Sequence, residues 1–170
     1  MTLNNILTDK SIKAKAKTKL IAELILSKNI SLDDLIKVTS NIKKDPDKAN
    51  CIEAIEYATK LFPDIANLNC LNFATQNLLA KASRIKWEAA KIVANIAPLY
   101  PQNLANTVAN LLENTTNESK VVRWSTAYAL SEIIKLKTNL NSQLLPKIET
   151  LLIHEKENSV KKIYETALKI

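Results

Sequence analysis

The only two tryptophans of the chain stand at matching places in two similar segments. Residues 84–97 read RIKWEAAKIVANIA and residues 120–133 read KVVRWSTAYALSEI, so Trp87 and Trp124 each follow a basic residue and precede small ones. An aromatic ring beside cationic groups favours noncovalent binding, because it offers apolar area, cation–π contacts and charge-assisted hydrogen bonds. The pattern therefore indicates recognition of a partner rather than catalysis.

Helical geometry gathers further side chains beside the tryptophans. At about 100° per residue, Trp87 and Lys91 fall on the helix side opposite the apolar stripe that contains Ile85. We call the predicted partner-binding surface the aromatic strip; its residues are Trp87, Lys91, Arg123, Trp124, Tyr128 and Lys162. A second interpretation is that each tryptophan packs flat between neighbouring helices, as large aromatic side chains often do.

The basic residues that precede the strip positions admit two interpretations. Lys86, Arg123 and Lys161 occupy equivalent places in three helices. One interpretation is that they bind a phosphate or carboxylate of a ligand, Arg123 through two nitrogens at once. The other, which we favour, is that they pair with acids or helix-end carbonyls of a neighbouring helix pair and fix how the pairs stack.

The sequence lacks the motifs of common enzyme classes. It contains no Gly, which excludes a Walker loop, a dinucleotide-binding fingerprint and a nucleophile elbow. Cys51, Cys70 and the lone His154 supply fewer ligands than a structural zinc site needs. Adjacent carboxylates such as Asp33 and Asp34 lie at a predicted helix start, where they suit capping better than acid–base chemistry. We therefore expect a protein that is not an enzyme and that uses no metal or other cofactor.

Composition favours one all-helical domain. The chain has 170 residues, of which 46% are hydrophobic, enough to bury a continuous core. The absence of Gly and the presence of only five Pro argue against the tight turns of β-sandwiches and barrels. The opening MTLNNILTDK does not resemble a signal peptide, and the longest apolar runs are shorter than a membrane span. We expect a cytoplasmic protein with no membrane partner.

Apolar residues recur at helical spacing along the chain, and polar residues and prolines mark the helix ends. In SKNISLDD, we expect Asn29 to adopt a left-handed conformation after one helix, and Ser31 with Asp34 to form the capping box of the next. Pro63 and Pro98 each stop a helix. The predicted helices are 11–28, 32–42, 47–62, 69–80, 84–97, 102–114, 119–136, 142–155 and 158–170.

The predicted helices repeat as pairs. Equivalent apolar residues of the second helices, Ile85, Val122 and Val160, are 37 and 38 residues apart. A helix pair of this length cannot bury both of its faces alone, so successive pairs must stack into one continuous core. The sequence thus predicts an all-α, right-handed superhelix, a solenoid of about four helix pairs. It forms a single domain, with an N-terminal helical cap over residues 1–30 and helix pairs over residues 31–170.

The second helices resemble those of HEAT repeats, in which an apolar residue and an Arg or Lys precede small residues and a Leu. VRWSTAYAL carries this pattern over residues 122–130, and IKWEAAKIV carries it over residues 85–93. The resemblance covers residues 47–170 and extends over 31–46 by continuation, although most first helices lack the proline of the family. HEAT arrays are armadillo-like, protein-binding scaffolds whose second helices line a concave side. The resemblance therefore implies recognition rather than chemistry.

The net charge of +7 leaves two kinds of partner to consider. Five lysines from Lys10 to Lys19 suit an anionic partner, but a chain rich in Lys, Asn and Ile also gains such charge from composition alone. HEAT-like DNA glycosylases resemble this chain in architecture, yet no Asp follows Asp64, so their essential concave Asp has no counterpart. Acids such as Glu88 and Glu132 interrupt the helices that would track phosphates. The predicted function is a noncatalytic scaffold that binds a protein or peptide on its concave surface, with nucleic-acid backbone binding as the weaker alternative.

Overall fold

The computed structural model describes residues 1–170 and contains ten α-helices, four short 3-10 helices and no strand. The α-helices are α1 (Leu3–Thr8), α2 (Ala14–Leu26), α3 (Leu32–Asn41), α4 (Asp45–Leu61), α5 (Leu68–Asn77), α6 (Ser83–Ile96), α7 (Ala105–Glu113), α8 (Lys120–Lys135), α9 (Asn141–His154) and α10 (Asn158–Ala167). The 3-10 helices cover Pro63–Ile65, Ala97–Leu99, Pro101–Asn103 and Asn114–Thr116. Every predicted helix is present, with ends that differ by a few residues.

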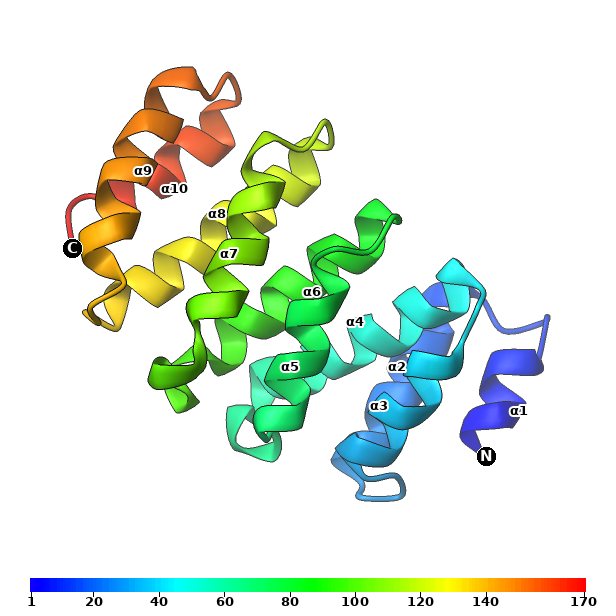
Figure 1. Cartoon of the computed structure of the whole chain (residues 1–170). Coiled ribbons are helices and arrows are strands. Elements are labelled where there is room, and N and C mark those ends of the chain that lie inside the picture. Colours follow the sequence, from blue (N-terminus) through cyan, green and yellow to red (C-terminus); the bar gives the residue numbers. More distant parts are fainter.

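The helices form two layers that curve together (Figure 1). One layer holds α3, α5, α7 and α9, and the other holds α2, α4, α6, α8 and α10. The helices of the second layer approach one another more closely than those of the first, so the second layer is the inner, concave side. The predicted fold class is confirmed: four helix pairs stack into an all-helical solenoid, and α1 and α2 lie at its N-terminal end.

The turn after α2 tests two predictions about helix ends. Ser31 accepts a hydrogen bond from the backbone N–H of Asp34 at 3.0 Å, so Ser31 is the N-cap of α3 as predicted. The carboxylate of Asp34 accepts from the hydroxyl group of Ser31 at 2.6 Å, in place of the backbone N–H that a full capping box uses. The prediction for Asn29 is wrong, because the left-handed residue is Lys28, with a φ of 59°. The N–H of Asn29 instead donates to the carbonyl of Leu24 at 2.9 Å and closes the turn. This closure requires the positive φ one residue before Asn29.

Helix α1 is missing from the sequence prediction, which starts the first helix at residue 11. The side chain of Thr2 caps α1 by accepting the N–H of Asn5 at 3.3 Å, and Ile6 is buried against α2. Lys17 of α2 donates from Nζ to the carbonyl of Leu7 at 2.6 Å. A helix this short shows no apolar periodicity and depends on such tertiary contacts. One lysine of the basic N-terminal segment is therefore structural.

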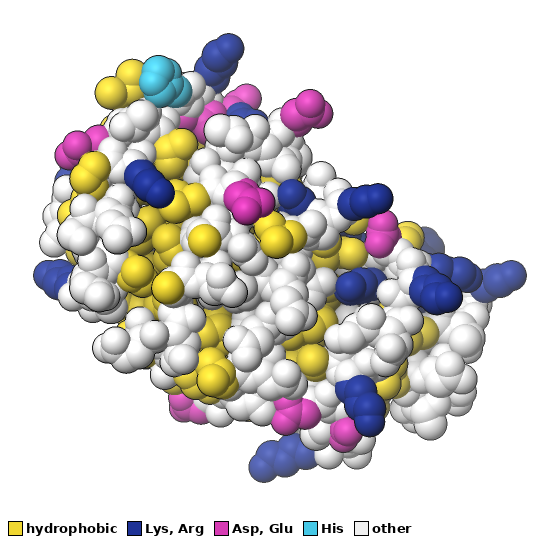
Figure 2. Space-filling model, in the orientation of Figure 1, with side chains coloured by type: hydrophobic (Ala, Val, Ile, Leu, Met, Phe, Trp, Pro, Cys, Tyr) yellow, Lys and Arg dark blue, Asp and Glu magenta, His cyan; other side chains and the backbone are white.

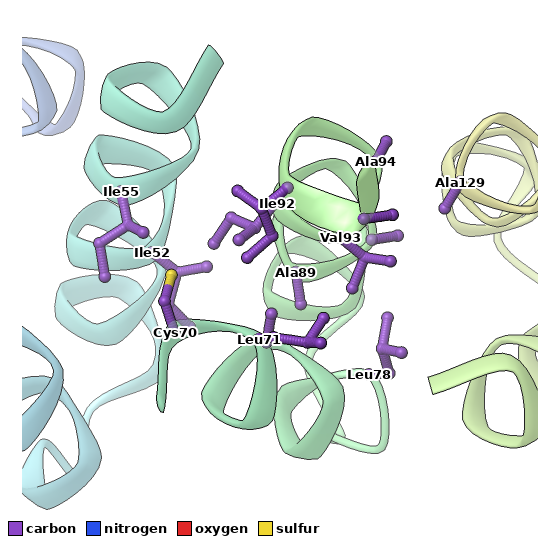
Figure 3. Close-up of a cluster of buried hydrophobic side chains, with 14 of the residues drawn as sticks. Ile52, Ile55, Cys70, Leu71, Leu78, Ala89, Ile92, Val93, Ala94 and Ala129 are labelled. Atoms are coloured by element: carbon purple, nitrogen blue, oxygen red, sulfur yellow. The ribbon is translucent and has the colours of Figure 1, made fainter. Parts of the chain in front are cut away.

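One cluster of buried hydrophobic side chains runs through the stack, from Ile6 in α1 to Ala167 in α10. Figure 3 shows its middle, where side chains of α4, α5 and α6 meet between the two layers. The labelled side chains there are Ile52, Ile55, Cys70, Leu71, Leu78, Ala89, Ile92 and Val93. Ala94 of α6 and Ala129 of α8 lie where these two inner helices face each other (Figure 3). Small side chains at this contact let the helix axes approach closely.

Both cysteines belong to this core as free thiols. Burial raises the pKa of Cys51 to about 11 and that of Cys70 to about 12. Thiols with such pKa values stay protonated at neutral pH and are poor nucleophiles and metal ligands.

The outer face is seen in Figure 2, where Lys side chains gather at the end of the molecule formed by α1 and α2. Toward the other end, basic and acidic side chains are interspersed (Figure 2). No helix combines the length and the apolar character that crossing a membrane would require.

Candidate functional site

The inner helix α6 positions the first half of the aromatic strip. Its buried residues, among them Ile85, Ala89 and Ile92, pack into the core. This packing fixes the rotation of the helix and leaves Trp87 and Lys91 half-buried at the inner surface. One helical turn separates these two side chains, so they lie next to each other.

On α8, two aromatic residues of the strip stack on each other. The ring centroids of Trp124 and Tyr128 are 5.7 Å apart, with 17° between the ring planes. Both side chains are half-buried and pack against the core along one side. They form a flat apolar surface that is partly open to solvent, which we call the α8 platform.

Charged groups of neighbouring inner helices act on the α8 platform. Burial raises the pKa of Tyr128, and the negative charge of Glu132 adds to the rise. Glu56 of α4 and Lys91 of α6 also influence this hydroxyl group, in opposite directions. Charges carried by three consecutive inner helices, α4, α6 and α8, therefore act on this hydroxyl group.

Lys91 is held by three neighbours. Its Nζ lies 3.1 Å from Oε2 of Glu56 and 3.0 Å from Oε2 of Glu88, and 5.5 Å from the centroid of the Trp87 ring. The side chains of Glu56 and Glu88 are 8% and 3% exposed, whereas that of Lys91 is 22% exposed. Burial by itself lowers the pKa of Lys91, but the attraction of Glu88 and Glu56 outweighs it and raises that pKa above its ordinary value.

Arg123 is engaged by other groups of the chain. Its Nε and Nη2 donate to the two carboxylate oxygens of Glu155 at 2.9 and 3.2 Å, and its Nη1 donates to the carbonyl of Asn117 at 2.9 Å. Lys86 of α6 donates in a similar way to Oδ1 of Asn114, at the end of α7, at 2.8 Å. Both residues thus join successive helix pairs, in keeping with the interpretation that such basic residues fix how the pairs stack. The guanidinium group of Arg123 is already paired with Glu155, and its role in partner binding stays a prediction.

Two pairs of the predicted strip residues lie next to each other, Trp87 with Lys91 and Trp124 with Tyr128. Lys162 is exposed on α10, the inner helix after α8, and its role in partner binding stays a prediction. We call the resulting surface the inner-face site; its residues are Glu56, Trp87, Glu88, Lys91, Trp124 and Tyr128.

The acidic partners on α4 escaped the sequence analysis. Glu56 pairs with Lys91, and Glu53 forms an ion pair with Arg84 of α6 while it accepts a hydrogen bond from Thr18 of α2 at 3.2 Å. A signal for the first pair existed, since Glu56 and Lys91 are 35 residues apart, close to the length of one repeat. The α4 segment carries no tryptophan, so the marker used to align the other inner helices is absent there.

The inner-face site is equipped for noncovalent binding. It combines one open aromatic surface, the α8 platform, with two buried carboxylates that Lys91 contacts, and such groups suit cationic side chains. No group of three or more His, Cys, Asp or Glu side chains is placed to hold a metal ion.

No family model matches the chain, and no curated protein matches it either. Several solved structures of similar fold do. A computationally designed armadillo repeat protein for modular peptide recognition has a TM-score of 0.74 at 19% identity, over 98% of this chain and 79% of that chain. A designed armadillo repeat protein in complex with the peptide (KR)4 has a TM-score of 0.72 at 19% identity, again over 98% of this chain and 79% of that chain. A third designed armadillo repeat protein has a TM-score of 0.71 at 18% identity with the same coverage of 98% and 79%.

These likenesses show the fold of the chain. The neighbours are armadillo repeat proteins, whereas the second helices of this chain resemble the HEAT pattern in sequence. The two types share the architecture of stacked helical repeats that curve into a solenoid. The chain is accordingly an armadillo-like α-solenoid.

Proposed function

We propose that the chain is a noncatalytic binding module that holds an extended peptide, or an extended segment of a protein, across its inner face. The observation that carries this proposal is the α8 platform, in which Trp124 stacks on Tyr128 and both rings remain half-buried on the concave layer. Aromatic residues in such positions usually supply much of the binding energy of an interface. The designed neighbours, one of which holds the peptide (KR)4, support this type of ligand.

The partner segment should contain at least one Lys or Arg side chain. The buried carboxylates of Glu56 and Glu88 outnumber the ammonium group of Lys91, so this part of the inner face is negative. A cation that lies over the α8 platform gains a cation–π contact in addition to this attraction. The same carboxylates repel phosphate groups, which argues against a nucleic-acid backbone as the ligand of this face.

We also propose that the repeats of this chain are of the HEAT type. Each of the four repeats is built from two α-helices. Arg123 and Lys86, at the place where the HEAT pattern has a basic residue, both join successive repeats.

Fluorescence anisotropy with a labelled (KR)4 peptide and a labelled (DE)4 peptide tests the proposal. Nonspecific attraction to a chain of net charge +7 favours the acidic peptide, so a preference for (KR)4 reports the inner face. We expect Trp124→Ala to weaken (KR)4 binding about 30-fold, which corresponds to about 2 kcal/mol. Phe62→Ala is the matched control, since Phe62 is 58% exposed at the end of α4, away from the platform. A preference for (DE)4, or equal binding by wild type and Trp124→Ala, would contradict the proposal.

A further inference from the structure

The aromatic surface of α6 is already covered by a cation of the chain itself. The ammonium group of Lys91 contacts the buried carboxylates of Glu56 and Glu88 at 3.1 and 3.0 Å and lies 5.5 Å from the ring centroid of Trp87. Two carboxylates and an aromatic face are the groups that hold a lysine side chain of a bound peptide. The contacts of Lys91 therefore have the form of ligand contacts.

The next repeat differs at the equivalent position. Lys91 follows Trp87 by four residues, and Tyr128 follows Trp124 by four residues, so the two places correspond. On α8 this place is taken by a phenol ring that stacks on its tryptophan with centroids 5.7 Å apart. The tryptophan of α6 is thus covered by a lysine of the same helix, whereas the tryptophan of α8 is not.

The surroundings of Lys91 remain negative even with its ammonium group in place. Glu56 and Glu88 face one cation between them, and Glu53 nearby is an acid that is paired with Arg84. Without Lys91, two buried carboxylates would lie beside an aromatic ring with no cation between them, and such groups take up either a proton or another cation.

We infer that Lys91 is an internal ligand: its side chain fills a pocket for a primary ammonium group, formed by Glu56, Glu88 and Trp87, and closes that pocket to other cations. The pocket accepts an alkylammonium ion when Lys91 is removed. One consequence rests on the proposed function. The wild-type inner face offers a cationic side chain of a peptide only the aromatic surface on α8, because Lys91 occupies the aromatic surface on α6.

Emptying the pocket tests the inference without any peptide. Lys91→Ala removes the 3-aminopropyl group beyond Cβ, and n-propylammonium chloride is the matching probe. We expect n-propylammonium to raise the Tm of Lys91→Ala by about 3 °C or more beyond its effect on wild type, with a saturable change in tryptophan fluorescence. The neutral analogue 1-propanol, and sodium chloride at equal ionic strength, should not reproduce the effect.

Lys91→Met is the matched control variant, because its uncharged side chain refills much of the same volume. It should respond to n-propylammonium as weakly as wild type. A Lys91→Ala chain that folds only in the presence of n-propylammonium supports the inference equally. Equal responses of wild type, Lys91→Ala and Lys91→Met would overturn it, and Lys91 would then be an ion-pairing residue of the stack only. The peptide experiment on wild type can fail while this one succeeds, so the two proposals are tested separately.

Discussion

The matching tryptophans occupy different chemical settings in the folded chain. Trp87 lies beneath the ammonium group of Lys91, whereas Trp124 stacks on Tyr128. Both are half-buried, so each side chain has a part that packs and a part that faces the inner surface. A single residue type at one repeat position thus gives a covered surface on one helix and a platform on the next.

This partial burial predicts a moderate effect of Trp124→Ala on folding. We expect the free energy of unfolding to fall by about 1–3 kcal/mol, less than the roughly 3–5 kcal/mol typical of a fully buried aromatic side chain. Urea denaturation would measure it, with Tyr164→Ala as the buried reference, since Tyr164 is 1% exposed, and Phe62→Ala as the exposed one. If Trp124→Ala were as costly as Tyr164→Ala, Trp124 would be packing between repeats and the platform would not be a binding surface.

The contact between Arg123 and Glu155 predicts a dependence of stability on pH. Desolvation by itself would raise the pKa of Glu155, but hydrogen bonds from Arg123 and from the backbone N–H groups of Glu157 and Lys156 outweigh it and hold that pKa below the ordinary value of 4.5. A carboxyl group whose pKa is lower in the folded state contributes stability above the unfolded value and loses it as the pH falls through the folded value.

We therefore expect Glu155→Gln to lower the free energy of unfolding by about 1–3 kcal/mol at pH 7. The difference from wild type should shrink as the pH falls below 4.5 and through the lowered pKa. Denaturant titrations between neutral and acidic pH would follow it, with Glu149→Gln on the exposed side of α9 as the control. A difference that stays constant over this range would show that the charge of Glu155 is not what stabilises the contact.

At the scale of the elements, the spacing of the inner helices depends on small side chains. Ala129 of α8 is fully buried where α8 meets α6, and Ala94 of α6 faces it (Figure 3). A larger side chain there would push the two helices apart or force strained rotamers. The inner layer transmits such a displacement to the inner-face site, because Lys91 and Tyr128 are carried by these same helices.

We expect Ala129→Leu to lower the free energy of unfolding by about 1–3 kcal/mol. Ala14→Leu, at an exposed position in the first turn of α2, should change it by less than about 0.5 kcal/mol. Thermal or denaturant unfolding of the two variants gives the comparison. Equal stabilities would mean that side-chain volume does not set the distance between α6 and α8.

At the scale of the whole molecule, stability should follow position in the stack. α6 packs against α4 on one side and α8 on the other, whereas α1 packs mainly against α2. In repeat proteins each unit is stabilised by its neighbours, so units with two neighbours open less often than those at an end.

Hydrogen exchange measures this gradient directly. We expect the amide groups of α4, α6 and α8 to exchange slowest and those of α1 and α10 fastest, with differences of one or more orders of magnitude, about 1.4 kcal/mol for each factor of ten. Exchange at one common rate in all ten helices would instead indicate that the solenoid opens only as a single unit.

The sequence by itself determined the helices, their pairing and the repeat length. Helix formation and capping depend on residues within one turn of each other, as for Ser31 and Asp34, and periodic apolar residues report which face is buried. The spacing of Ile85, Val122 and Val160 then fixes the repeat. Helix α1 could not be predicted in this way, because its six residues are too few to show an apolar period. It also depends on a tertiary contact, the hydrogen bond from Lys17 to the carbonyl of Leu7.

Only the tertiary structure decided how the candidate site residues are used. Lys91 is paired with Glu56, 35 residues away in sequence, and Arg123 is paired with Glu155, 32 residues away. A basic residue on a helix surface can face a ligand or a neighbouring repeat. The sequence of its own helix does not distinguish these two outcomes. The outcome depends on where the carboxylates of adjacent helices lie once the repeats have stacked, because ion pairs form only over a few ångströms.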